Sequence, residues 1–320
     1  MTLFGYHNSH EQFSPADLLR YTVQAEQAGF NAAFCSDHIA PWSEAQGESG
    51  FNWSWLGAAM QATSLPFGSF NAPGYRYHPA IIAQAIATLN MMFPERLFVA
   101  FGSGEALNEH ITGGRWPLKA ERNERLKHNA EIIRALLAGE TVSDDRYVTV
   151  HEAKIWSLPE TMPTLFGGAL SEETARHIGS WADGMITVNA EPEKIKALIA
   201  VFREVAGDDA PVYIQSHVSW ANTDEEARAN AFDQWRPNVL AGDLGADLWS
   251  VQHFDAAAAY VRPEDLDGSV RISSDPGKHR EWIHQDLELG VQGVFLHNVG
   301  RNQEAFIEAF GKDVLPGFVS

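Results

Sequence analysis

The stretch from residue 163 to residue 207, PTLFGGALSEETARHIGSWADGMITVNAEPEKIKALIAVFREVAG, decides the predicted fold. Residues 163–168 and 184–188 are short apolar runs typical of strands, and each is followed by a longer segment with helical periodicity. Ser171 can open the first of these helices. Strand and helix therefore alternate. This pattern predicts a parallel sheet, because each helix returns the chain for another strand in the same direction.

The same alternation continues toward both ends of the chain. Six further strands are predicted, at residues 3–6, 31–37, 66–72, 97–102, 211–221 and 293–299. Eight strand–helix units close naturally into a (β/α)8 TIM barrel. An open doubly wound sheet is the alternative, but the glycine-rich dinucleotide fingerprint is missing after the first strand, where the chain reads YHNSHEQF. We expect one domain over residues 1–320, with a hairpin at 141–159 and a mostly helical insertion at about 222–274 after the seventh strand.

Composition narrows the range of partners. The chain is 45% apolar and 20% charged, with 42 acidic and 23 basic side chains and a formal charge of −19. Because such a surface repels phosphate backbones and anionic lipids, we expect no nucleic-acid or membrane partner. The single cysteine excludes an internal disulfide, and residues 1–13 lack the pattern of a signal peptide. These features predict a cytoplasmic protein.

Polar residues that could carry chemistry follow three neighbouring strands. SDHIAPW places Asp37, His38 and Trp42 after the second strand, and GSGEALNEH places Glu105 and Asn108 after the fourth. In a barrel these positions converge on one mouth. His38 and Glu105 are a plausible acid/base pair, although each could instead hold a neighbouring loop or turn. The chain has 13 histidines but no HExxH, cysteine cluster or His-x-His on a strand, so we predict no metal site.

These loops make the sequence recognisable. It resembles the bacterial-luciferase-like superfamily of flavin- and deazaflavin-dependent oxidoreductases, near the branch of deazaflavin-dependent glucose-6-phosphate dehydrogenases. The resemblance rests on EQFSP from Glu11, SDHIAPW from Ser36, RYHPAIIAQAIATL from Arg76 and GSGEALNE from Gly102. It implies a barrel with an insertion after strand seven, usually a homodimer, that acts on a small organic molecule.

The resemblance also implies roles for individual residues. The residue matching His38 is a base on the substrate hydroxyl, the one matching Glu105 handles a proton on the other side, and those matching Asp37 and Trp42 support the site. Ser69 and Phe70 would form a bulge with a non-prolyl cis peptide behind the cofactor ring, and Gly167 and Gly168 would approach the cofactor phosphate. The full set of implied cofactor-binding residues is Asp37, Ser69, Phe70, Ser103, Gly104, Asn108, Gly167 and Gly168.

Departures from the family pattern bear on substrate and cofactor. The three basic residues that hold the sugar phosphate fall on Glu191, Asp255 and Ser269, which argues against glucose 6-phosphate. SHEQF from Ser9 and SGFNWSWLGAA from Ser49 resemble a group suspected of using an ordinary flavin. We therefore expect a flavin-dependent oxidoreductase with FMN that acts by hydride transfer or monooxygenation. A flavin reductase that supplies the reduced flavin is a candidate partner. The alternatives are an F420-dependent dehydrogenase of a non-phosphorylated alcohol or sugar and, less favoured, a metal-dependent hydrolase.

Overall fold

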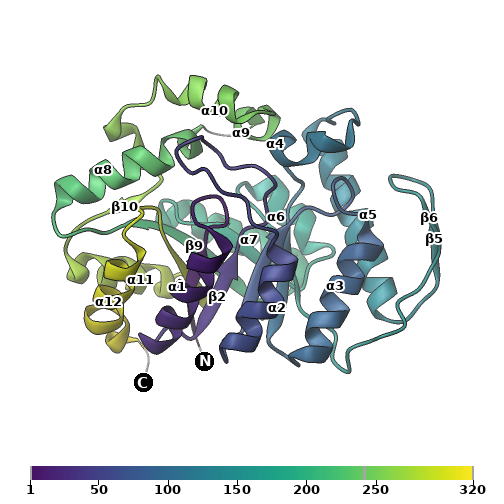
Figure 1. Cartoon of the computed structure of the whole chain (residues 1–320). Coiled ribbons are helices and arrows are strands. Elements are labelled where there is room, and N and C mark those ends of the chain that lie inside the picture. Colours follow the sequence, from purple (N-terminus) through teal and green to yellow (C-terminus); the bar gives the residue numbers. More distant parts are fainter. Residues whose placement is uncertain (1, 241–242, 319–320) are drawn as a thin grey trace.

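A closed barrel of parallel strands forms the centre of the molecule. The computed structural model describes residues 2–240 and 243–318 (Figure 1). Eight of the nine strands in the main sheet, all except β10, run around the barrel, and β9 closes it by pairing with both β8 and β11. The eight are β1 (Leu3–Asn8), β2 (Ala32–Cys35), β3 (Phe67–Asn71), β4 (Leu97–Phe101), β7 (Leu165–Gly168), β8 (Gly184–Val188), β9 (Val212–Ser219) and β11 (Gly293–Asn298). This closure confirms the predicted TIM barrel and rules out the open sheet.

Aromatic side chains fill the inside of the barrel. Phe34, Phe98, Phe166 and Phe295 form a buried cluster there, against which Tyr213 packs. A Cβ atom on Gly68 would come within 2.3 Å of the Phe34 and Phe98 rings, so this position in β3 needs glycine. The interior is therefore a packed core, and a ligand can bind only above it, at an end of the barrel.

Helices surround the strands as the alternation predicts. The first, α1, begins at Pro15 with Ser14 as its cap, since the Ser14 hydroxyl accepts a hydrogen bond from Asp17 N. None of the helices in the described part of the chain is long and apolar enough to cross a membrane. The others around the barrel are α2 (Asn52–Ala62), α3 (Pro79–Met92), α4 (Ala106–Glu109), α5 (Lys119–Leu137), α6 (Glu172–Gly179), α7 (Pro192–Ala206), α11 (Pro276–Glu288) and α12 (Gln303–Asp313), with short 3-10 turns η1 (His110–Thr112) and η4 (Leu315–Gly317), and α1 itself spans Pro15–Gln27.

Two segments depart from the simple repeat. The predicted hairpin is β5 (Val142–Asp144) paired antiparallel with β6 (Val150–Ala153), and it lies at the side of the barrel in Figure 1. The insertion lies across the carboxyl ends of the strands, at the top of Figure 1. It is helical as predicted, except that it also contains β10 (Arg271–Ile272), a short strand parallel to β9. Its helical elements are α8 (Asp224–Trp235), η2 (Arg236–Val239), α9 (Asp243–Asp247), α10 (Val251–Ala258) and η3 (Pro263–Leu266).

Histidines form a layer directly above the aromatic core. His297 on β11 is the register partner of His217 on β9, and the His7 ring on β1 lies 4.3 Å from the His297 ring, centroid to centroid. Burial lowers the pKa of His7 to about 3 and that of His217 to about 4, while the positive charges of neighbouring histidines or of Arg271 oppose protonation further. These rings therefore stay neutral in the folded protein across the physiological range.

The histidine layer predicts a loss of stability in mild acid. Below pH about 6.5 the unfolded chain binds protons that the folded chain does not, so each such histidine lowers the free energy of unfolding by about 1.4 kcal/mol per pH unit. We expect this loss to run from pH about 6.5 down to the lowered pKa values. Urea unfolding at a series of pH values measures it. His7→Gln should make the pH dependence shallower, whereas His151→Gln, on the exposed hairpin, should leave it unchanged; equal slopes in all three proteins would contradict the idea.

Candidate active site

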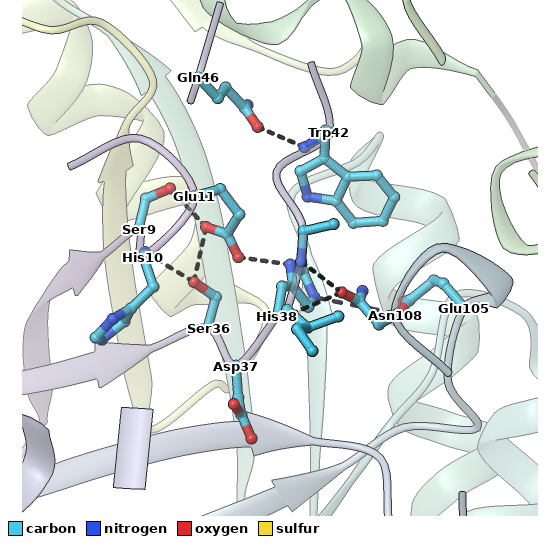
Figure 2. A network of polar contacts seen from close by, with 12 residues as sticks. Ser9, His10, Glu11, Ser36, Asp37, His38, Trp42, Gln46, Glu105 and Asn108 are labelled. Carbon is cyan, nitrogen blue, oxygen red and sulfur yellow. Dashed lines mark hydrogen bonds and ion pairs between the residues drawn. The ribbon is translucent and has the colours of Figure 1, made fainter. Parts of the chain in front are cut away.

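A buried contact with Glu11 holds His38 at the mouth of the barrel. Glu11 follows β1, His38 follows β2, and Glu11 Oε1 lies 2.5 Å from His38 Nδ1 (Figure 2). The second carboxylate oxygen of Glu11 accepts hydrogen bonds from the Ser9 and Ser36 hydroxyls, both at 2.8 Å. Glu11 thus fixes the His38 ring at Nδ1, which leaves Nε2 free to act on a ligand.

The charges of this pair support each other. Burial by itself lowers the pKa of His38, but the Glu11 carboxylate, helped by Glu105, outweighs it and leaves the pKa above its ordinary value. Burial would raise the pKa of Glu11, yet His38 and the two serine hydroxyls bring it well below its usual range. Glu11 is therefore a permanent carboxylate, and His38 is a base whose strength Glu11 sets. Glu11 is the first residue of the EQFSP motif, but the sequence alone assigned it no role.

Glu105, Trp42 and Asn108 surround the free side of His38. Glu105 Oε2 lies 4.0 Å from His38 Nε2, and the Trp42 ring meets the histidine edge-on at 5.2 Å between centroids. The Asn108 side-chain oxygen accepts hydrogen bonds from the backbone N–H groups of residues 39 and 40, at 3.0 and 3.4 Å. Three of the residues predicted from sequence therefore meet at His38, and Asn108 fixes the loop that carries it.

Asp37 points away from His38, as Figure 2 shows, and belongs to a second charge cluster. Its Oδ1 accepts a hydrogen bond from the Tyr77 hydroxyl at 3.0 Å and lies 3.6 Å from Arg76 Nη1. Burial raises the pKa of Asp37, although Arg76 and Tyr77 oppose the change. Asp37 therefore anchors the loop after β3 and does not orient the histidine next to it in sequence.

Glu109, at the end of α4, completes this second cluster and was not predicted. One of its oxygens lies 3.6 Å from Arg76 Nε, and the other accepts a hydrogen bond from the Arg76 backbone N–H at 2.8 Å. Burial raises the pKa of Glu109 to about 7; Arg76 opposes this, and the carboxylates of Glu105 and Asp37 add to it. A buried carboxyl group with a raised pKa that lines a small cavity together with His38 is a candidate for proton chemistry.

Phe70 lies between two glycines of neighbouring strand ends and Ser69 faces α2, and their contacts with a cofactor stay predictions. The Phe70 ring lies between Gly102 and Gly168, where an added Cβ atom would come within 2.6 Å of it. The side chain of Ser69 instead faces α2 and accepts a hydrogen bond from Asn52 Nδ2 at 2.6 Å. The expected cis peptide and bulge are wrong, because every peptide bond in the described ranges is trans and β3 pairs with β4 in unbroken register.

The remaining predicted glycines have structural reasons of their own. A Cβ on Gly167 would lie 2.8 Å from the Ile178 side chain, so this glycine lets α6 pack on β7. Gly104 has a φ of 81°, a left-handed conformation that favours glycine. Ser103, next to it, is only partly buried. Contacts of Gly167, Gly168, Ser103 and Gly104 with a cofactor stay predictions.

Two cavities lie close to this site. The small one has a volume of about 10 Å³, close to the space of a single water molecule. The larger one has a volume of about 720 Å³ and lies between the segment after β4 and the insertion, with Tyr75, Trp116 and Trp249 in its walls. Glu109 lines both cavities. The residues around the small cavity are Asp37, His38, Phe70, Asn71, Ala72, Gly104, Glu105 and Glu109.

The free polar atoms at the mouth suit a flavin-type ring better than a metal. Asp37 Oδ2, Asn108 Nδ2 and both amide atoms of Asn71 are buried without a hydrogen-bond partner among the described residues. A heterocycle whose edge alternates C=O and N–H groups can pair with such mixed donors and acceptors. Because the small cavity holds only about one water, a tricyclic ring can enter only if neighbouring side chains move. Within residues 2–240 and 243–318, no three His, Cys, Asp or Glu side chains are grouped so as to hold a metal ion.

Comparisons with known proteins agree with this geometry. Residues 1–293 match the model of the luciferase-like monooxygenase family. The chain is 33% identical, over 98% of its length and 96% of the relative's, to an F420-dependent glucose-6-phosphate dehydrogenase of Microbacterium testaceum. It is also similar to the structure of an F420-dependent secondary alcohol dehydrogenase in complex with an F420–acetone adduct, with a TM-score of 0.91, 27% identity and 98% coverage of both chains. The FMN complex of a Baeyer–Villiger monooxygenase from Pseudomonas putida shares the fold, at 17% identity, with a TM-score of 0.71 and 98% coverage of both chains.

The Glu11–His38 pair predicts how the histidine titrates. We expect Glu11→Gln to lower the pKa of His38, because the charge in contact with Nδ1 is lost. NMR titration of the His38 ring measures this directly. Glu105→Gln is the matched control: it removes a carboxylate at 4.0 Å and should shift the pKa less. If both variants leave the titration unchanged, Glu11 does not control the histidine.

Proposed function

The chain belongs to the luciferase-like monooxygenase family, and we propose that within it the protein is an F420-dependent dehydrogenase that oxidises a secondary alcohol without a phosphate group. The observation that carries the proposal is the position of His38 at the mouth of the barrel: Glu11 holds its Nδ1, and its Nε2 is free. This is the arrangement of a base that removes the proton of a bound hydroxyl group. An oxidoreductase is what the family implies; the cofactor and the substrate are our proposal.

The relatives favour F420 over FMN, although FMN is the cofactor expected from the sequence. Similar chains at 27% to 33% identity depend on F420, whereas the FMN-binding neighbour is more distant and supports only the fold. Phe70, the Asn71 amide, Asp37 and Asn108 would hold the ring. When bound, the deazaflavin accepts a hydride. FMN is the alternative cofactor, and the supply of reduced flavin by a reductase belongs to that alternative.

The residues around His38 define the rest of the reaction. The neutral Nε2 takes the hydroxyl proton, and Glu11 stabilises the positive charge that then forms on the ring. Trp42 and Phe254 pack edge-on at 5.1 Å and shield this side of the site from water. Glu105 lies on the other side of His38 Nε2 and can receive the proton from it.

The substrate is proposed to lack phosphate because the positions that would hold one carry negative charge. Glu191 is exposed just before α7, at the rim of the barrel. Asp255 lies on α10 of the insertion and accepts a hydrogen bond from the Glu44 backbone N–H at 3.1 Å. Both carboxylates would repel a phosphate dianion.

The homodimer, the cytoplasmic location and the single domain over residues 1–320 stay predictions.

A titration of the purified protein tests the cofactor. We expect F420 to bind at least about tenfold more tightly than FMN or FAD, a difference of about 1.4 kcal/mol in binding free energy. Fluorescence of each cofactor, followed during addition of protein, measures the three affinities under the same conditions. Tighter binding of FMN would move the proposal to an ordinary flavin enzyme and make oxygen consumption the next assay.

Turnover tests the base and the substrate class. We expect reduction of F420 by 2-propanol or another neutral secondary alcohol, and none by glucose 6-phosphate. His38→Ala should lower kcat by about 100-fold or more, because a positioned acid/base contributes at least that much. The affinity for F420, measured in the same preparation, is the control for an intact site. An unchanged kcat would remove His38 from the mechanism.

A further inference from the structure

Glu109 is a buried acid that separates the site from a cavity open to solvent. Its side chain is only 1% exposed, yet it lines both the small cavity beside His38 and the 720 Å³ cavity behind it. The larger cavity reaches the surface, since Arg115 and Trp249 in its wall are 70% and 57% exposed. A proton that crosses from one cavity to the other can therefore pass through this one carboxyl group.

The charges around Glu109 favour such an exchange. Arg76 lies between two buried carboxyl groups, Asp37 and Glu109, with 3.6 Å to each. One positive charge cannot neutralise both, so the cluster retains a proton easily, in line with the pKa of about 7 at Glu109. Glu105, one helical turn before Glu109, adds a third carboxylate on the side of the site.

The groups on the cavity side leave Glu109 open to proton exchange. Arg125 donates hydrogen bonds to the backbone oxygens of residues 74 and 147, and Arg115 pairs with Glu121 at 2.6 Å. Asp247 accepts hydrogen bonds from Trp116 and Arg122, at 3.0 and 3.1 Å. His110 follows Glu109 and directs its Nδ1 to the helix backbone. Within the described residues, the ion-pair and hydrogen-bond partner of Glu109 is therefore Arg76.

We propose that Glu109 carries the proton released at His38 out to solvent. The inference rests on the proposed dehydrogenase. Oxidation of the alcohol breaks its C–H and O–H bonds and leaves the ketone: the hydride would go to the cofactor, which departs as its reduced anion, and the proton goes from the hydroxyl oxygen to His38 Nε2. From His38 the proton passes through the small cavity, which Glu105 and Glu109 line, to the Glu109 carboxyl group. Glu109 then releases it as a hydronium ion into the water of the large cavity. Glu109 acts through His38 and Glu105, and it does not touch the substrate.

A purely structural role as the counter-ion of Arg76 predicts different behaviour. Arg76 already has Asp37 as a partner and donates from Nη2 to the backbone oxygen of Asp37 at 2.6 Å. A counter-ion also needs no contact with the small cavity, which Glu109 nevertheless lines. The two roles can be separated because a glutamine keeps the hydrogen bond to the Arg76 backbone but cannot carry a proton.

The test compares Glu109→Gln with Glu121→Gln, which removes a carboxyl from the outer wall of the same large cavity. With F420 and 2-propanol we expect Glu109→Gln to keep the rate of the first turnover but to lower steady-state turnover by about tenfold or more, since proton release then limits the rate. Glu121→Gln should match the wild type. In Glu109→Ala, added formate should restore turnover, because a small carboxylic acid can enter a 720 Å³ cavity.

An infrared spectrum of the cofactor-free protein gives a second readout. Near neutral pH we expect a carboxylic-acid C=O band that shifts rapidly in D2O, disappears in Glu109→Gln and persists in Glu121→Gln. Thermal unfolding of each variant shows whether it has folded. The proton path would be overturned if Glu109→Gln slowed the first turnover as much as the later ones and formate did not restore Glu109→Ala. An unchanged steady-state turnover in Glu109→Gln would overturn it as well. Absence of turnover by the wild type with every alcohol would instead overturn the proposed function.

Discussion

Closure of the parallel sheet is the constraint on which everything else depends. Because β9 pairs with β8 on one side and β11 on the other, all the strands of the barrel end at one rim. The interior offers no room, since aromatic rings fill it below a layer of histidines. Ligand chemistry is therefore confined to the loops at the rim, and the insertion lies over them (Figure 1).

The rim carries two buried clusters of charged side chains, which differ in their ratio of acidic to basic groups. Glu11 and His38 form a matched pair, in which the carboxylate offsets part of the desolvation cost of protonating the buried ring. Asp37, Arg76 and Glu109 are unmatched, with one positive charge for two acids. The matched pair sets the strength of a base, whereas the unmatched cluster keeps a proton within reach of it. The two clusters are joined through Asp37 and His38, which are neighbours in the chain.

The sequence predicted the barrel well because its signals are local. Strand runs, caps such as Ser14 and the insertion after strand seven all follow from periodicity and from residue preferences. It also brought His38, Glu105 and Trp42 together, since the ends of neighbouring strands must meet. What it missed depends on direction and on distant partners. Asp37 turns toward Tyr77 and Arg76, Ser69 faces α2, and Glu11 reaches His38 from another strand. Periodicity does not say which charged groups from separate loops end up in contact.

The same rim can serve different substrates because its base and its outer charges are independent. Glu11 and His38 are held by the ends of β1 and β2, with hydrogen bonds from Ser9 and Ser36 in the same two loops. Glu191 and Asp255 lie on other segments, the loop after β8 and the insertion, where exchange of one charge disturbs no buried contact of the base. Under the proposed function, the hydroxyl chemistry can therefore be kept while the charge at the rim changes. Under the proposed function, the acidic side chains at the rim favour an uncharged alcohol over a phosphate ester.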